Sequence, residues 1–472
     1  DDHKIGLLFS GGVDSTYLSK KLQDYDVDFK CYVAGLKEPR LKDSRDVDKA
    51  EKAAEELGLD LEVIEINLEQ VENTLPSLVP LIEDNNVVKV GVALPFYLAA
   101  KQAKEDGVKI MFSGLGSEEI FAGYNRHKKS RDVNEECLSG LRKTYERDLY
   151  RDDVVCMKNN IELRLPFLDQ DLVRYALTID PSLKLKDGKT KYIFRKHAES
   201  IGVPKKFAWR KKRAAQYGSN FDKALDKLSN AEDKYKSEYV EQFYDEGNVR
   251  LGALISTGKD SLLATQIMME QNYDIRCFIT IHSKNQDSYM YHGPNTSLAE
   301  EQAETANKPL IQVNSEGEKE EELEDLKQGI KEAVEQHNIE GIVTGAIYST
   351  YQRDRVEKIC EDLGIKCFSP LWHMDQEDEV RMLEKKNFEW IMVKIAAQGL
   401  DKDWLGKPIT EEDIDSLVTL NDDIGFNIAG EGGEYESFVT YAPFFDEKIM
   451  IDDYEIREES EIEATMQIKK IR

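Results

Sequence analysis

Cysteine is scarce in this 472-residue chain, and the six that occur are scattered over positions 31, 137, 156, 277, 360 and 367. No two form a C-x-x-C pair, which argues against a disulfide framework, a zinc ribbon and a cysteine-ligated cluster. Scattered thiols suit the reducing cytoplasm, where we expect the protein to reside. The chain also lacks an apolar run near the roughly 20 residues that cross a bilayer, and it shows no signal peptide. We therefore expect no membrane partner.

Positive charge is also in short supply. Lysine and arginine total 64 against 92 aspartates and glutamates, giving a formal net charge of -28. An extended nucleic-acid surface needs a clustered basic face, so this balance disfavours nucleic acid as a partner. One local basic patch remains, at 205–206 and 210–213. With 40% hydrophobic residues, the chain is long enough for two globular domains with separate cores.

Two short segments carry the strongest signal, SGGVDS at 10–15 and STGKDS at 256–261. Each follows an apolar strand-like run and precedes a helix-like run. Small residues at a strand-to-helix turn let backbone N–H groups converge on an anion, and the helix N-terminus adds partial positive charge. Serine hydroxyls can donate to phosphate oxygens, and the aspartates can hold Mg²⁺. Two such segments predict two nucleotide-binding modules that use ATP and Mg²⁺.

Both halves alternate strand-like and helix-like patterns, which is typical of a parallel sheet covered by helices. The predicted strands include 61–66, 108–112, 274–281, 309–313 and 341–344. Ser44 and Gly58 bound one expected helix, and a second spans 318–337 with apolar residues at helical spacing.

The polar, charged stretch 220–248 predicts a helical boundary between the halves. The predicted domains are therefore residues 1–222 and 248–472, with 223–247 as a linker. From about residue 400 the pattern changes to short strand-like runs with glycine-rich turns. We interpret that part as an extension facing the substrate.

Four further segments of the first half stand in the order found in one enzyme family. They are FSGLGSEEIFAGY at 112–124, RLPFLD at 164–169, KYIFR at 191–195 and WRKK at 209–212. SGGVDS resembles the pyrophosphate loop of N-type ATP pyrophosphatases, and the set resembles the synthetase domain of asparagine synthetases and β-lactam synthetase over 5–219. The resemblance implies that ATP activates a carboxylate as an acyl-adenylate, that pyrophosphate leaves, and that a nitrogen nucleophile displaces AMP.

The resemblance also implies residue roles in the first half. Asp14 and Glu118 would bind Mg²⁺, although the family usually has Asp at the second position, and Lys212 would act in catalysis by stabilising charge on the transferring phosphate. The nucleotide would contact Ser10, Gly11, Gly12, Asp14, Ser15, Gly114 and Gly116. From the residues alone, Glu118 could instead belong to a solvated helix start and Lys212 to a solvated basic surface. Leu115 replaces an acid of asparagine synthetases, and the sequence lacks a glutaminase domain, so we do not expect asparagine synthesis from glutamine.

Three segments of the second half resemble another family, diphthine–ammonia ligase. They are GAIYS leading to YQRDRVE over 345–357, PLW at 370–372, and EGGEYES leading to APFF over 431–445. With STGKDS the resemblance covers residue 250 to about 446. It implies amidation of diphthine, a modified histidine of translation elongation factor 2, from ATP and ammonium with release of AMP and pyrophosphate.

In the second half the loop residues and one glycine are expected to contact ATP, namely Ser256, Thr257, Gly258, Lys259, Asp260, Ser261 and Gly345. Lys259 is also a predicted catalytic residue that holds the polyphosphate, and Asp260 a predicted Mg²⁺ ligand. Thr257 stands where a glycine is usual, which costs free energy if the loop needs a positive φ there.

The EGGEYES motif offers three carboxylates and a pair of glycines. Gly432 and Gly433 permit close approach of a substrate, with Glu431 as a further predicted contact and Glu434 and Glu436 as predicted catalytic residues. The carboxylates could hold the trimethylammonium of diphthine, accept a proton from ammonia or bind a second metal; an acidic β-turn of structural role would look alike. Arg353 is a predicted substrate contact, and a salt-bridged helix face is the alternative.

The fold class implied is α/β, with two HUP-like (adenine nucleotide alpha hydrolase-like) domains and a small α+β extension at the C-terminus. The leading hypothesis is an AMP-forming amide ligase that acts on diphthine of elongation factor 2. The first module would be a second adenylating domain or a scaffold, and a homodimer stays open. The alternatives are a tRNA-modifying ATP pyrophosphatase and an amide synthetase acting on a small carboxylate.

Overall fold

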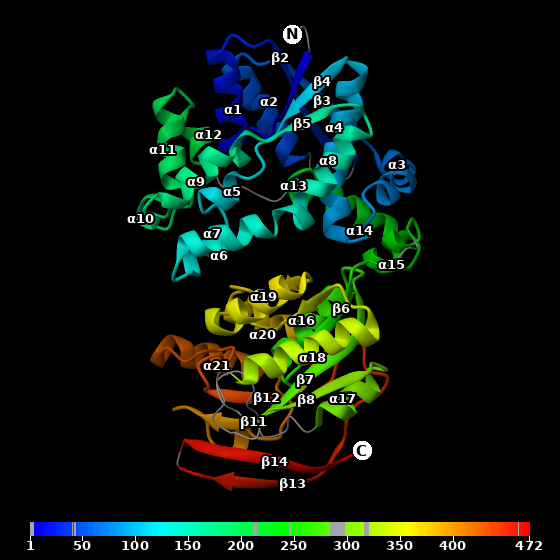
Figure 1. Cartoon of the computed structure of the whole chain (residues 1–472), viewed down its shortest axis with the longest axis vertical. Helices are drawn as coiled ribbons and strands as arrows, with labels where there is room; N and C mark the ends of the chain where they lie inside the picture. Colours follow the sequence, from blue (N-terminus) through cyan, green and yellow to red (C-terminus); the bar gives the residue numbers. More distant parts are fainter. Residues whose placement is uncertain are drawn as a thin grey trace. The chain divides into compact units, whose positions relative to one another are not determined.

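The computed structural model describes residues 4–39, 41, 44–210, 215–244, 248–283, 298–315, 321–460 and 462–472. The chain forms two compact units, Asp1–Glu246 and Gly247–Arg472, whose elements are labelled in Figure 1. Among the described residues, no helix is both long and apolar enough to cross a bilayer.

The sheet of the first unit is parallel throughout. Its order is β3-β2-β1-β4-β5, with β3 at Leu61–Ile66, β2 at Phe29–Leu36, β1 at Lys4–Leu8, β4 at Val108–Phe112 and β5 at Glu162–Arg164. The predicted strands 61–66 and 108–112 are confirmed. Strand β1 lies between β2 and β4, at the point where strand order reverses, and ligands bind beyond the carboxyl ends of strands at such a point.

The first unit has a hydrophobic core on each face of its sheet, because alternate residues of β2 enter different cores. Cys31 and Val33 enter one, and Tyr32 and Ala34 enter the other. The first core is covered by helices that include α1 (Val13–Asp24), α2 (Arg45–Leu57), α11 (Tyr192–Ser200) and α12 (Lys205–Ala208). The second is covered by α3 (Leu68–Leu81), α4 (Val87–Glu105), α8 (Tyr150–Met157), α14 (Phe221–Ala231) and α15 (Lys236–Glu241).

Further short helices stand between these elements along the chain. They are α5 (Ser117–Ile120), α6 (Asn125–Lys129), α7 (Val133–Arg142), the π-helix η1 (Tyr145–Leu149), the 3₁₀ helix η2 (Pro166–Leu168), α9 (Gln170–Thr178), α10 (Pro181–Lys184) and α13 (Ala215–Gly218). Helix α2 has the predicted ends: Ser44 Oγ accepts a hydrogen bond from Val47 N–H at 3.3 Å, and Gly58 takes a φ of 63°.

The stretch predicted as a linker, 223–247, is corrected by the structure. Its described part is helical, as expected, but α14 and α15 pack into the first unit. Phe221, Leu225 and Tyr239 are buried in the core beside α4. Many charged residues on the exposed faces of these helices give the segment a polar composition, and that composition hides the apolar face.

The second unit repeats the parallel sheet with the same order of strands along the chain. Its order is β10-β9-β6-β7-β8, with β10 at Lys366–Phe368, β9 at Gly341–Val343, β6 at Arg250–Leu254, β7 at Asp274–Ser283 and β8 at Leu310–Ser315. Strand β6 corresponds to β1, and β9 to β4. Helices α16 (Lys259–Met269), α17 (Ala299–Thr305), α18 (Glu321–His337) and α19 (Thr350–Leu363) flank it. In α18, predicted over 318–337, Leu326 and Ile330 are buried as expected, and residues 318–320 lie outside the described residues.

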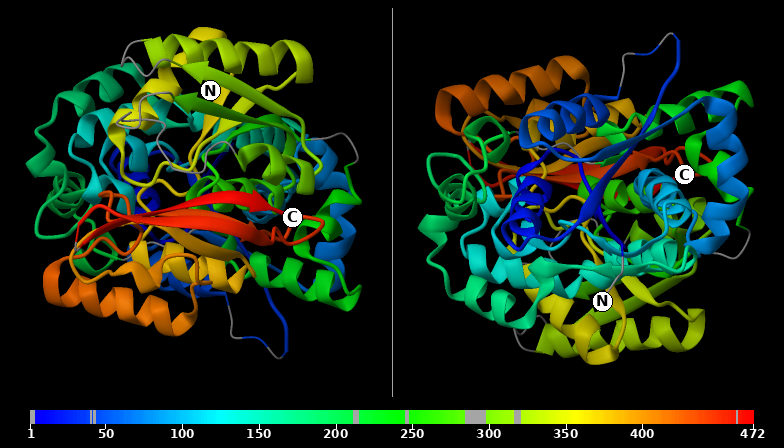
Figure 2. Two further views of the ribbon diagram at one scale, coloured as in Figure 1. Left: turned by 90° about the horizontal axis from the view of Figure 1, so that it is seen from below. Right: turned by 90° about the horizontal axis from the view of Figure 1, so that it is seen from above.

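The extension predicted from about residue 400 starts earlier: it is an antiparallel sheet with two helices that includes α20 (Gln376–Lys385) and β11 (Glu389–Ala396), and Figures 1 and 2 show its strands in orange to red. Its order is β12-β11-β14-β13, with β12 at Tyr435–Tyr441, β11 at Glu389–Ala396, β14 at Glu463–Ile471 and β13 at Ile451–Glu458. Helices α20 (Gln376–Lys385) and α21 (Glu411–Ile424) and the short helix η4 (Lys402–Trp404) accompany it. Its buried residues continue the core of the parallel sheet. The predicted fold class is confirmed.

Candidate functional site

The first predicted loop lies at the carboxyl end of β1, at the switch point of its sheet. Gly11 has a φ of 64°, and Gly12 caps α1 with φ −82° and ψ 168°. A Cβ added to Gly11 would stand 2.7 Å from the carbonyl oxygen of Lys49, a backbone atom. Both the positive φ and this contact require glycine. The N–H groups of the first turn of α1 are thereby presented at the sheet edge.

The second loop has the same backbone shape. Thr257 has a φ of 68°, and Gly258 caps α16 with φ −82° and ψ 164°. The positive φ suspected from the sequence is therefore present, and a β-branched residue carries it at a cost in free energy. The Thr257 carbonyl accepts hydrogen bonds from Val439 N–H at 3.1 Å and from Gln302 Nε2 at 3.1 Å. These two bonds, one of them from β12, hold the strained loop in place.

Two of the predicted glycines support the loops by close packing. An added Cβ on Gly114, after β4, would lie 2.8 Å from Asp14 Cβ. An added Cβ on Gly345, after β9, would lie 2.6 Å from Ser261 N. The third, Gly116, caps α5 with a φ of 95°. In both units, then, a glycine on the neighbouring strand's loop packs directly against the phosphate-loop candidate.

In the first unit, a buried lysine stands between the two predicted metal ligands. Lys191 Nζ donates to Asp14 Oδ1 at 2.7 Å and pairs with Glu118 Oε1 at 2.8 Å. Ser117 Oγ donates to Asp14 Oδ1 at 2.7 Å. Lys191 is 2% exposed, so its charge is matched by carboxylates rather than water. Sequence reasoning noticed Lys191 only as part of a motif and gave it no role.

The donor chemistry of Asp14 and Glu118 fits Mg²⁺. This ion takes one or two carboxylates and completes its shell with phosphate oxygens and water. A dedicated all-protein cage is not needed, and the described part of the chain gathers no group of three or more His, Cys, Asp or Glu residues of that kind.

In the second unit, the lysine of the loop itself stands between two carboxylates. Lys259 pairs with Asp260 and, at 3.3 Å, with Glu379 Oε2. Lys259 is 1% exposed and Glu379 0%. Burial raises the pKa of Glu379 well above its usual range, although Lys259 opposes this. Glu379, on α20, was missed by sequence reasoning. In the first loop, Val13 stands at the position that Lys259 has in the second loop. There the buried cation is instead Lys191, the N-cap residue of α11.

The EGGEYES segment lies directly against the second loop. Ser437 Oγ accepts a hydrogen bond from Lys259 N–H at 3.1 Å, and Val439 binds the Thr257 carbonyl as described. Tyr435 is buried, and its ring stacks on that of Trp390 with the ring centroids 5.9 Å apart. Its hydroxyl donates a hydrogen bond to the Ile428 carbonyl at 2.7 Å. A structural tyrosine thus anchors the motif, and β12 joins it to the loop.

The three carboxylates of this motif have different surroundings. Glu431 Oε2 accepts a hydrogen bond from Tyr348 N–H at 3.3 Å, and burial raises its pKa to about 7. Glu434 Oε2 accepts from Gly432 N–H at 2.9 Å inside the turn, where Gly433 has a φ of 87°. Glu436 faces Lys394 across β11 and β12 at 3.7 Å.

Two basic residues were also predicted to act at the sites, Arg353 in the second unit and Lys212 in the first. Arg353, on α19, is 4% exposed, lies 4.0 Å from the Trp372 ring centroid and pairs with Asp354 at 2.9 Å. Lys212 lies outside the described residues. Its neighbour Arg210 reaches the first loop, where Nη1 donates to the Ser10 carbonyl at 2.7 Å.

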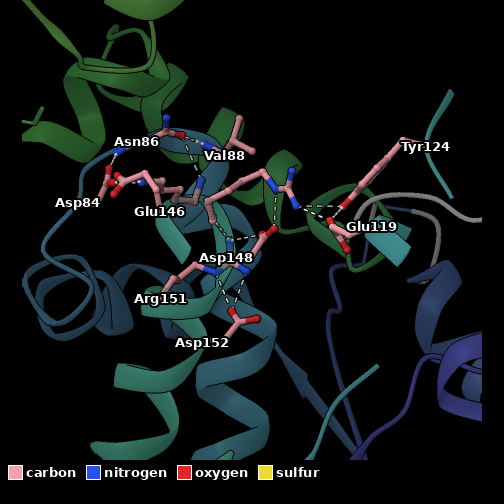
Figure 3. A network of polar contacts seen from close by, with 11 residues as sticks. Asp84, Asn86, Val88, Glu119, Tyr124, Glu146, Asp148, Arg151 and Asp152 are labelled. Atoms are coloured by element: carbon pink, nitrogen blue, oxygen red, sulfur yellow. Dashed lines mark hydrogen bonds and ion pairs between the residues drawn. The ribbon is translucent and has the colours of Figure 1, made fainter. Parts of the chain in front are cut away.

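A polar network extends from the second acid of the GLGSEE segment in the first unit (Figure 3). Tyr124 donates its hydroxyl to Glu119 Oε1 at 2.7 Å, and Arg147 pairs with the same oxygen. Arg147 comes from the π-helical turn, and the network continues through Asp148 to Arg151 and Asp152. Glu119 is fully buried, so it belongs to this network rather than to a solvated helix start.

Profiles of three domain families match the chain. The asparagine synthase profile matches residues 1–136 and 128–248, just over half of the chain. The diphthamide synthase N-terminal domain matches residues 249–367, and the diphthamide synthase C-terminal domain matches residues 375–472. The boundary between the two diphthamide synthase domains falls between β10 and α20, where the part with the antiparallel sheet begins.

Diphthine–ammonia ligase of Bos taurus is 34% identical over 227 residues, which make up 44% of this chain and 85% of that protein. The chain belongs to the diphthine–ammonia ligase family. The human diphthine–ammonia ligase is likewise 34% identical, over 44% of this chain and 85% of its own length. This membership makes the chain an ATP-dependent C–N ligase and confirms the predicted resemblance of the second half.

The first half is similar to asparagine synthetases, of which the chain spans about half. One from Methanocaldococcus jannaschii is 31% identical over 264 residues, 48% of each chain. The human enzyme is 29% identical and covers 52% of this chain and 44% of its own length. The predicted resemblance of the first half is thereby confirmed. Among solved structures, NMN synthetase of Francisella tularensis is 13% identical, covers 52% of this chain and 84% of its own, and has a TM-score of 0.25.

Proposed function

We propose that this ligase joins ammonium to a carboxyl group with cleavage of ATP to AMP and pyrophosphate, and that the carboxyl group is that of diphthine on elongation factor 2. The observation that supports this most is the hydrogen bonding of β12 to the second loop through Val439 and Ser437. It joins the segment carrying the EGGEYES acids to a loop whose shape suits a polyphosphate. We expect the reaction to take place in the cytoplasm.

The second loop supplies the groups that an adenylation step needs. Backbone N–H groups at the start of α16 would hold the pyrophosphate that leaves. Lys259 carries a positive charge within the same turn, and Ser256 and Ser261 add hydroxyl donors. Asp260 would hold Mg²⁺, which when bound neutralises phosphate charge. Donors and a cation fixed in advance in this way stabilise a departing pyrophosphate more than water does.

We propose that the first loop is a second nucleotide site in which Asp14 and Glu118 would hold Mg²⁺ and Lys191 supplies the cation. Leu115 has no titratable group, which favours a binding or regulatory role over a second full reaction. Isotope exchange between ATP and pyrophosphate on Asp14→Asn and Asp260→Asn variants separates the two modules. Exchange lost only with Asp260→Asn assigns adenylation to the second unit; exchange lost only with Asp14→Asn contradicts this assignment.

The direct test is incubation with diphthine-bearing elongation factor 2, ATP and isotopically labelled ammonium, followed by mass spectrometry of the modified peptide. We expect the label in the peptide as an amide, in equal amount to AMP. ATP consumption with an unlabelled peptide would show that the ligase acts on another carboxylate.

A further inference from the structure

We propose that Glu431 binds ammonium beside the second loop and takes the proton that ammonium must lose before it attacks. The proposal rests on the proposed amidation and names the residue that handles its nitrogen source. It also separates Glu431 from the other two acids of the motif, which the structure places in other contacts.

Glu434 and Glu436 have structural partners. The carboxylate of Glu434 closes its own turn by accepting the Gly432 N–H at 2.9 Å. Glu436 faces Lys394 on the adjacent strand at 3.7 Å, in register with it. Neither contact belongs to the loop of 256–261.

Glu431, in contrast, is tied to the elements that build the loop. It accepts the backbone N–H of Tyr348 at 3.3 Å. Tyr348 lies three residues after Gly345, where an added Cβ would stand 2.7 Å from the Asp260 carbonyl carbon and 2.6 Å from Ser261 N. A short, well-packed connection therefore anchors the Glu431 carboxylate near the start of α16.

The charges around Glu431 favour a small cation. Its carboxyl is partly removed from water, and the charged groups that act on its pKa most strongly include Asp260 and Lys259 of α16 and Glu434 of its own segment. Lys259 already pairs with Asp260. The carboxyl groups of Asp260, Glu431 and Glu434 therefore outnumber the one lysine that acts on them, and ammonium, a compact cation with N–H donors only, would relieve that excess. A carboxyl with a pKa raised to about 7 can also accept a proton near neutral pH.

The proposed step balances as follows. The Glu431 carboxylate takes one proton from ammonium and becomes a carboxylic acid, leaving ammonia. The nitrogen lone pair forms a C–N bond to the acyl carbon of the acyl-adenylate. The acyl C–O bond then breaks with its electron pair on the phosphate of AMP, and the amide nitrogen loses a second proton to solvent.

The test compares Glu431→Gln with the parent in two assays on diphthine-bearing elongation factor 2. We expect ATP–pyrophosphate exchange within about twofold of the parent and amide formation lowered about 100-fold at neutral pH, a typical loss for a general base. The defect should shrink as pH rises toward the pKa of ammonium, because solution then supplies ammonia directly. Glu389→Gln is the control. It removes the surface ion pair that Glu389 of β11 forms with Lys448, and both of its activities should match those of the parent.

A loss of amide formation that stays constant with pH would overturn the proposal, as would a Glu431→Gln enzyme equal to the parent. If the parent itself does not amidate, the proposed function fails instead, so the two failures are distinguishable. Should Glu431→Gln not fold, Glu431→Asp keeps the carboxylate, and we expect it to retain the parent's pH profile at a lower rate. A shifted profile in that variant contradicts the assignment.

Discussion

Replacing Gly345 with alanine tests whether the second loop must keep its observed shape. Gly345 is not among the glycines with positive φ, so its backbone tolerates alanine and only the added methyl matters. That Cβ would stand 2.6 Å from Ser261 N and 2.7 Å from the Asp260 carbonyl carbon. Ordinary contact begins at 3.4 Å, so the loop must move by about 0.8 Å.

A displacement of about 1 Å at a reacting centre can cost roughly 100-fold in rate. We therefore expect Gly345→Ala to lower kcat/KM for ATP by about 10- to 100-fold, measured by ATP–pyrophosphate exchange. Overpacking of this kind should also lower the free energy of unfolding by about 1–3 kcal/mol, which urea titration measures.

Gly364→Ala is the matched control. Gly364 caps α19 at a φ of 68° with no atom within 4 Å of an added Cβ. It should lose about 1–2 kcal/mol of stability from backbone strain and leave kcat/KM for ATP unchanged. A folded Gly345→Ala enzyme with parental kcat/KM would refute the reasoning that loop position sets ATP use.

Three further predictions follow from single residues. Thr257→Gly should raise the free energy of unfolding of the second unit by about 0.5–1 kcal/mol, because strain of roughly 1–2 kcal/mol outweighs the entropy of glycine; a lower urea midpoint contradicts this. Lys191→Met leaves two buried carboxylates unmatched and should cost the first unit about 3–5 kcal/mol, whereas the exposed Lys196→Met should cost less than about 0.5 kcal/mol in the same urea titration. Burial raises the pKa of Asp152 to about 6, so the native state binds the extra proton and stability falls as pH rises from about 4 to 6; Asp152→Asn should flatten this fall, and an unchanged slope of unfolding free energy against pH would count against it.

Periodicity and turn chemistry predicted the fold well. Local sequence patterns were enough to predict the strands at 61–66 and 108–112 and both ends of α2, because these features depend on nearby residues alone. The prediction of a linker over 223–247 was wrong because its apolar residues, such as Leu225 and Tyr239, are too few to change the composition of the segment, yet they suffice to bury one face of its helices.

The site was predictable only where a motif encodes it. Both loops and their supporting glycines follow from short strings with known backbone demands. Lys191 lies 177 residues from Asp14, and Glu379 lies 120 residues from Lys259. No local pattern joins such positions; only the tertiary fold of each unit brings them together. The surroundings of Glu436 likewise depend on the pairing of β12 with β11, which places this residue opposite Lys394.

The most direct test of the account is the identity of the ATP products when diphthine-bearing elongation factor 2 and ammonium are present. Chromatography should find one AMP and one pyrophosphate for each amide formed, and neither product from the Asp260→Asn enzyme. Release of ADP and phosphate, or amide formation that survives Asp260→Asn, would contradict it.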